Sequence, residues 1–151
     1  YIKAEEVISP LVENFPGHPY FSFLKGELLA KSEKWGELDD FMPKLEAFTV
    51  SGPFFKQNEC QLKLAYIHAL KAFHHGNYSL SIEKCDWIIS NYHMEFDWLK
   101  GFAHFLRGQS LEAIGEFGLA VADYEEVLKM DSYYPEVDKA QKRIREMKKR
   151  T

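Results

Sequence analysis

The sequence predicts an all-α fold in which antiparallel helical hairpins stack on one another. Two observations predict it. Apolar side chains recur with the period of an α-helix along most of the chain, and a short turn pattern recurs between those segments. The 151 residues are 46% hydrophobic and 15% aromatic, which is enough to fill one continuous core. The composition therefore argues against a disordered chain.

The turn pattern is clearest at residues 76–82, Gly-Asn-Tyr-Ser-Leu-Ser-Ile, and at residues 115–121, Gly-Glu-Phe-Gly-Leu-Ala-Val. A weaker copy at residues 33–38, Glu-Lys-Trp-Gly-Glu-Leu, keeps the aromatic residue and replaces the glycine with Glu33. Each copy lies between two helix-period segments, which is how a helical hairpin appears in a sequence. The predicted hairpins are residues 19–52, 53–94 and 95–134.

The two ends of the chain are predicted to be single helices. Residues 1–18 look like the second helix of a preceding hairpin, and because the amphipathic pattern is already present at Tyr1 we expect a longer parent chain. Residues 135–151 begin with a proline, a helix starter, and carry one apolar stripe, as expected for a capping helix. That stripe consists of Val137, Ala140, Ile144 and Met147. Pro10 and Pro43 fall inside predicted helices, where each should kink or restart the helix.

Small side chains are expected where neighbouring helices touch, because a Gly, Ala or Ser removes bulk that a larger side chain from the facing helix then fills. The small residues and the larger residues that pack beside them are predicted at twelve positions where helices touch: Gly26, Leu29, Leu38 and Met42 in the first hairpin, Ala69, Ala72, Ser81 and Cys85 in the second, and Gly108, Leu111, Ala120 and Tyr124 in the third.

This spacing resembles the tetratricopeptide repeat, whose pattern is an aromatic residue, Leu-Gly, Tyr, Ala, a second aromatic residue and a final Pro. The resemblance covers residues 19–134. His104 and Arg107 stand where the family has Trp and Leu, and Ser132 stands where it has Pro, although Pro135 follows. The resemblance implies a right-handed superhelix of about three units.

In that family the first helices of the hairpins line a concave groove that binds extended peptides. Carried over to this chain, the groove positions are Tyr20, Phe23, Glu27, Lys63, Tyr66, Leu70, Phe73, Phe102, Phe105 and Gln109. The resemblance therefore implies an aromatic groove suited to an apolar or amphipathic segment of a protein partner.

Family members that grip the carboxyl terminus of chaperones use Lys, Asn and Arg side chains in this groove. The matching places here hold Phe23 and Glu27, then Ile67, then Phe102 and Leu106. A receptor for chaperone tails is therefore not indicated.

Three functions remain open: a non-enzymatic interaction module, a purely structural or oligomerising helical segment, and an accessory domain of an upstream enzyme. Joint exposure of the groove rings would favour the first function, because a monomer seldom leaves such a patch unused, and their burial would favour the second. The rings in question are those of Phe23, Tyr66, Phe73, Phe102 and Phe105.

The charges argue against nucleic acid along the main surface. Residues 1–138 carry 12 basic and 22 acidic side chains, whereas residues 139–151 carry 7 basic and 1 acidic. Phosphate binding needs clustered cations, and only the tail has them. We expect the tail to be mainly a solvated face, although it could touch an acidic partner, anionic lipid or RNA. Its cations are Lys139, Lys142, Arg143, Arg145, Lys148, Lys149 and Arg150.

No catalytic motif is present, so no enzymatic activity and no cofactor are predicted. Cys60 and Cys85 have no CxxC spacing, which argues against zinc and a disulfide framework. His68 and His75 would share a helix face about 10 Å apart, too far to hold one metal ion. No apolar run is long enough to span a membrane. The compartment stays open, and a homo-oligomer is compatible with the sequence.

Overall fold

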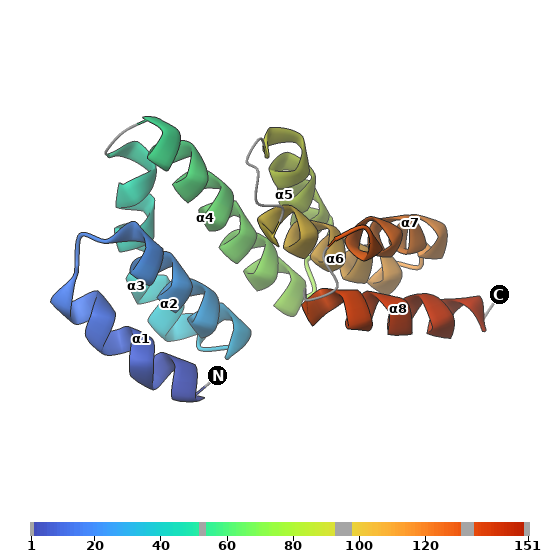
Figure 1. The fold of residues 1–151 in the computed structure, drawn as a ribbon, viewed down its shortest axis with the longest axis horizontal. Helices are drawn as coiled ribbons and strands as arrows, with labels where there is room; N and C mark the ends of the chain where they lie inside the picture. Colours follow the sequence, from blue (N-terminus) through green and yellow to red (C-terminus); the bar gives the residue numbers. More distant parts are fainter. Residues whose placement is uncertain (1, 52–53, 93–97, 131–134, 150–151) are drawn as a thin grey trace. The chain divides into compact units, whose positions relative to one another are not determined.

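The computed structural model describes residues 2–51, 54–92, 98–130 and 135–149, which form eight α-helices and no β-strand (Figure 1). The predicted all-α fold is confirmed. Each predicted hairpin range holds two helices, and the ranges before and after them hold one each. The helices are α1 (Ile2–Asn14), α2 (Pro19–Lys31), α3 (Trp35–Val50), α4 (Phe54–His74), α5 (Tyr78–Asn91), α6 (Trp98–Ala113), α7 (Phe117–Leu128) and α8 (Pro135–Lys148). Tyr1, Ser132 and Arg150 lie outside the described residues.

The three copies of the turn pattern adopt the same backbone. After α4, the N–H of Gly76 donates to the carbonyl of Phe73 and the N–H of Asn77 donates to the carbonyl of Ala72. The same two hydrogen bonds close the turns after α6 and after α2. The residue in the left-handed region has φ 75° at Gly76, 86° at Gly115 and 57° at Glu33. The weaker copy is thus the same turn with a non-glycine residue at its strained position.

All twelve positions predicted to lie where helices touch are buried. Two of them leave no room for a Cβ atom. A Cβ on Gly26 would lie 2.7 Å from Cδ1 of Leu45 and 3.0 Å from Cδ1 of Ile67, and a Cβ on Gly108 would lie 2.7 Å from Cε1 of Tyr124. The absence of a side chain at these glycines lets α2 approach α3 and lets α6 approach α7.

The chain divides into two compact units, residues 1–71 and 72–151, and the division falls inside α4. In the first unit, α1 packs on α2 through Ile8, Val12 and Leu28. The interior of this unit also contains large side chains with at most 1% of their surface exposed, namely Leu29, Leu38, Leu45, Leu62 and Ile67.

In the second unit, α6 packs against both α5 and α7, and α8 packs mainly against α7. The core gathers Leu111 of α6 and Tyr124 of α7 with the predicted apolar stripe of α8. All four stripe residues are buried. The amphipathic pattern of residues 135–151 therefore identified correctly the face by which α8 covers the preceding helices.

Pro10 and Pro43 lie inside α1 and α3, and neither ends its helix. Of the two expected effects, a kink or a restart, the restart does not occur. Both prolines are exposed, as are Glu6 and Asp39 four residues earlier, whose carbonyl groups lose their helical donor. Water can satisfy those carbonyls at the surface, which removes one part of the cost of a proline inside a helix.

Candidate functional site

The ten predicted groove residues lie on α2, α4 and α6, but their exposure differs. Tyr20 is 56% exposed. The half-buried members are Glu27, Lys63, Phe73, Phe102, Phe105 and Gln109. Phe23, Tyr66 and Leu70 are buried, with 3%, 5% and 6% of their surface exposed.

Several of the buried and half-buried rings pack within the fold. Phe23 packs against Phe48 of α3, with ring centroids 6.3 Å apart, and Phe105 packs against Tyr124 of α7 at 5.5 Å. Phe102 also packs against the core of the second unit. The five groove rings are therefore not exposed together, because the facing helix of the same unit covers part of the set.

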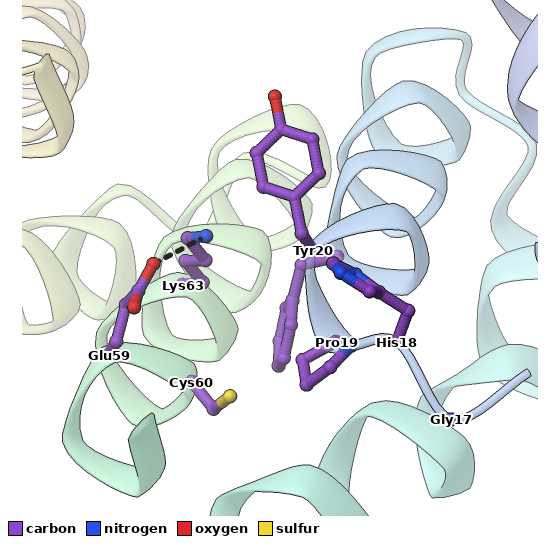
Figure 2. A pocket seen from close by; sticks show the side chains of 8 residues that line it. Gly17, His18, Pro19, Tyr20, Glu59, Cys60 and Lys63 are labelled. Atoms are coloured by element: carbon purple, nitrogen blue, oxygen red, sulfur yellow. Dashed lines mark ion pairs between the residues drawn. The ribbon is translucent and has the colours of Figure 1, made fainter. Parts of the chain in front are cut away.

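Three of the ten residues meet in a pocket of the first unit, which we call the α2–α4 pocket (Figure 2). Its volume is about 250 Å³. Its lining comes from the start of α2 and the first half of α4, and consists of Gly17, His18, Pro19, Tyr20, Phe23, Glu59, Cys60 and Lys63.

The chain enters this pocket through a turn that ends at α2. Pro19 occupies the start of the helix, where its missing N–H costs no hydrogen bond, and His18 at the cap position makes no side-chain capping bond. The His18 ring stacks instead on Phe21, with centroids 4.5 Å apart. This local packing leaves Tyr20 projecting away from the helix beside the pocket, as Figure 2 shows.

The polar side of the pocket is built on α4. Glu59 and Lys63 lie one helical turn apart, and Nζ of Lys63 is 2.9 Å from Oε1 of Glu59. The same ammonium group lies 5.3 Å from the centroid of the Tyr20 ring, within the range of a cation–π contact. Of these two contacts, the one with Tyr20 joins α4 to α2, and the ion pair with Glu59 lies within α4. Phe23 and Pro19 add apolar lining to the pocket.

A second opening, in the second unit, brings together two more predicted residues, Phe73 and Gln109, with Glu112, Ala113 and Arg143. Its two charged groups pair with each other. Nε of Arg143 donates to Oε2 of Glu112 at 3.1 Å, and the hydroxyl of Tyr124 donates to the same oxygen at 3.1 Å. Burial and the Glu112 carboxylate raise the pKa of Tyr124, which keeps this hydroxyl protonated as a donor.

The Arg143 contact corrects the interpretation of the basic tail as a solvated face. Arg143 is half-buried and joins α8 to α6 through Glu112, and it also pairs with Glu146 at 2.7 Å. Lys139, Lys142, Arg145, Lys148 and Lys149 are exposed.

A buried polar network in the second unit was missed from the sequence. Nδ1 of His104 lies 2.8 Å from Oδ1 of Asp123, and Nε of Arg107 donates to Oδ2 of Asp123 at 2.8 Å. Arg107 also binds Asp86 of α5. Burial alone would raise the pKa of Asp123, but the hydrogen bonds from Arg107 and His104 outweigh it and hold the pKa below its usual value. The sequence signal was present in His104 and Arg107, two of the three departures from the tetratricopeptide pattern noted above.

The network joins α5, α6 and α7 to one another. Asp123 is only 3% exposed, so its carboxylate has no access to a substrate. The neighbouring thiol of Cys85 is fully buried, and burial raises its pKa to about 12, so it stays protonated and unreactive at neutral pH. Cys60 and Cys85 form no disulfide. Among the described residues, no group of three or more His, Cys, Asp or Glu side chains is placed to hold a metal ion.

None of the helices in the described part of the chain is long and apolar enough to cross a membrane. Comparisons of the chain with known protein families, with curated proteins and with solved structures give no match.

Proposed function

We propose that this chain is a non-enzymatic interaction module that binds a peptide or helical segment of a partner protein at the α2–α4 pocket. In this proposal the hairpins are tetratricopeptide-like units that stack into a right-handed superhelix. The three identical turns and the close helix contacts at Gly26 and Gly108 support it, because both features are expected when one hairpin design is repeated.

The observation that carries the proposal is the gathering of Tyr20, Phe23 and Lys63 in one open pocket. These residues come from the first helices of two successive hairpins, the surface that the resemblance assigns to ligand binding. Tyr20 offers a large, rigid and exposed ring, which is the type of side chain that contributes most to peptide interfaces. The buried Phe23 forms part of the apolar lining.

The proposal is tested by selecting peptides from a displayed random library against the immobilised chain. Selected peptides should bind the parent protein and lose affinity at least tenfold for Tyr20→Ala, since interface tyrosines contribute on the order of 2 kcal/mol. Val7→Ala is the matched control, because Val7 is 66% exposed on α1, outside the pocket. Circular dichroism must show equal helix content in both variants. Selected peptides that bind the two variants equally well would overturn the proposal.

The burial of Phe23, Tyr66 and Leu70 favours a second candidate, a structural helical segment without a ligand of its own. It predicts that selection enriches no peptide above an unrelated helical protein. It also predicts that Tyr20→Ala lowers the unfolding midpoint of the chain, because the ring would then act only through its contacts with Lys63 and Phe21.

A further inference from the structure

The α2–α4 pocket contains a cation of its own. The ammonium group of Lys63 lies between an aromatic ring and a carboxylate, 5.3 Å from the Tyr20 ring centroid and 2.9 Å from Oε1 of Glu59. An aromatic face combined with a carboxylate is the set of groups that proteins use to hold organic cations. Half of this set, Tyr20, comes from α2 and the other half, Glu59, comes from α4.

The resident cation is easily displaced. Lys63 forms an ion pair within its own helix and a cation–π contact with Tyr20, and it keeps 28% of its side chain exposed. Such partly exposed pairs contribute little to stability, and a flexible lysine can turn its ammonium group into water without losing the packing of its stem. A second cation could therefore take the place of Lys63 between Tyr20 and Glu59 while leaving every other contact of the pocket intact.

An anionic ligand fits less well. It would have to draw Lys63 away from Glu59, leaving a carboxylate whose side chain is only 37% exposed without its cation. The excess of acidic side chains over residues 1–138 also repels anions and attracts cations at long range. Both the local geometry and the overall charge favour a positively charged occupant.

We propose that the α2–α4 pocket binds an arginine side chain of the partner segment, which displaces Lys63 and pairs with Glu59 while its planar face stacks on Tyr20. This inference rests on the proposed function. Arginine is preferred to lysine because the guanidinium group is planar, weakly hydrated and able to bind a carboxylate through two parallel N–H groups. The apolar base formed by Phe23 and Pro19 accommodates the methylene stem.

The inference is tested by titrating the isotope-labelled chain with blocked single amino acids while amide chemical shifts are followed by NMR. The probes are N-acetyl-arginine amide, its neutral isostere N-acetyl-citrulline amide, and N-acetyl-glutamate amide. We expect the arginine probe alone to give saturable shifts at residues 17–20 and 59–63. Glu59→Gln should reduce its affinity at least fivefold, because the variant keeps the shape of the side chain and removes the charge.

Lys63→Met gives the most distinctive result. It removes the competing cation and keeps an apolar stem, so the affinity for the arginine probe should rise about two- to fivefold, the worth of a partly exposed ion pair. Lys71→Met is the matched control, because Lys71 lies on the same helix and pairs with Asp39, outside the pocket. It also removes one positive charge, and it should leave the affinity unchanged.

Each other outcome overturns the inference. Equal binding of arginine and citrulline would exclude a charge-based site. Weaker binding of the arginine probe to Lys63→Met would show that Lys63 does not compete with it, and saturable binding of the glutamate probe would show an anion site instead. If no probe binds but library peptides still depend on Tyr20, the arginine inference fails and the proposed function stands. If neither the probes nor the library peptides bind, the arginine inference and the proposed function both fail.

Discussion

Replacing Glu33 with glycine should stabilise the protein. Glu33 occupies the position in the turn after α2 that Gly76 and Gly115 occupy after α4 and α6, and it adopts φ 57°. An L-residue in this region costs about 1–2 kcal/mol. Glycine avoids that cost but adds about 0.4–1 kcal/mol of backbone entropy to the unfolded chain. The expected gain in the free energy of unfolding is therefore about 0.5–1 kcal/mol.

The reverse substitutions provide the complementary test. A Cβ added at Gly76 or Gly115 would meet no atom within 4 Å, so the effect of Gly76→Ala or Gly115→Ala comes from the backbone angle alone. Each should lower the free energy of unfolding by about 0.5–1 kcal/mol. At all three turns the protein with glycine should therefore be the more stable one. Replacing Glu33 with glycine should raise the free energy of unfolding, and replacing Gly76 or Gly115 with alanine should lower it.

The assay is urea unfolding followed by circular dichroism. With a slope of about 2 kcal/mol per molar urea, Glu33→Gly should raise the midpoint by about 0.3–0.5 M at an unchanged slope. Glu33→Ala is the control, because it removes the same side-chain groups as Glu33→Gly and keeps the strained angle, so its midpoint should lie below that of Glu33→Gly. Equal midpoints for Glu33→Gly and Glu33→Ala would refute the reasoning.

Three further predictions concern buried positions. Gly108→Ala should lower the free energy of unfolding by about 1–3 kcal/mol in the same assay, because the new Cβ would overlap the Tyr124 ring. Ser22→Ala should be neutral or stabilising, since the buried Ser22 hydroxyl has no hydrogen-bond partner, whereas Ser110→Ala should cost about 1 kcal/mol because it removes two hydrogen bonds. The pKa of Asp123 is lower in the folded protein than in the unfolded chain. Its contribution to the free energy of unfolding is therefore complete above the pKa of the unfolded chain, about 4, and is lost as the pH falls through the pKa of the folded protein. Unfolding midpoints measured from pH 7 to pH 3 should fall in the parent and fall less steeply in Asp123→Asn; parallel curves would contradict this assignment.

The helices and turns could be predicted because their signals are local. The turn after α4 depends on residues 72–77, and the copies after α2 and α6 have equivalent spacing, so one aligned pattern places all three. The apolar stripe of α8 is equally local, because four side chains on one helix face must be buried against something.

The candidate site could be predicted only in part, because burial depends on the facing helix. Tyr20 and Phe23 lie three residues apart on α2, and the sequence predicts a groove position for both. Tyr20 is exposed, whereas Phe23 is covered by Phe48 of α3. The contact of Tyr20 with Lys63 joins residues 43 positions apart, for which a single sequence gives no signal.

The network around Asp123 fixes the register of three helices. Smooth apolar faces could slide past each other by one helical turn, about 5.4 Å, and still bury similar surface. Such a slip of α6 would carry His104 and Arg107 away from the carboxylate and leave Asp123 charged and unpaired in the interior, at a cost of about 3–5 kcal/mol. The polar residues that break the repeat pattern therefore give α5, α6 and α7 a single alignment, and neighbouring apolar side chains can vary without shifting it.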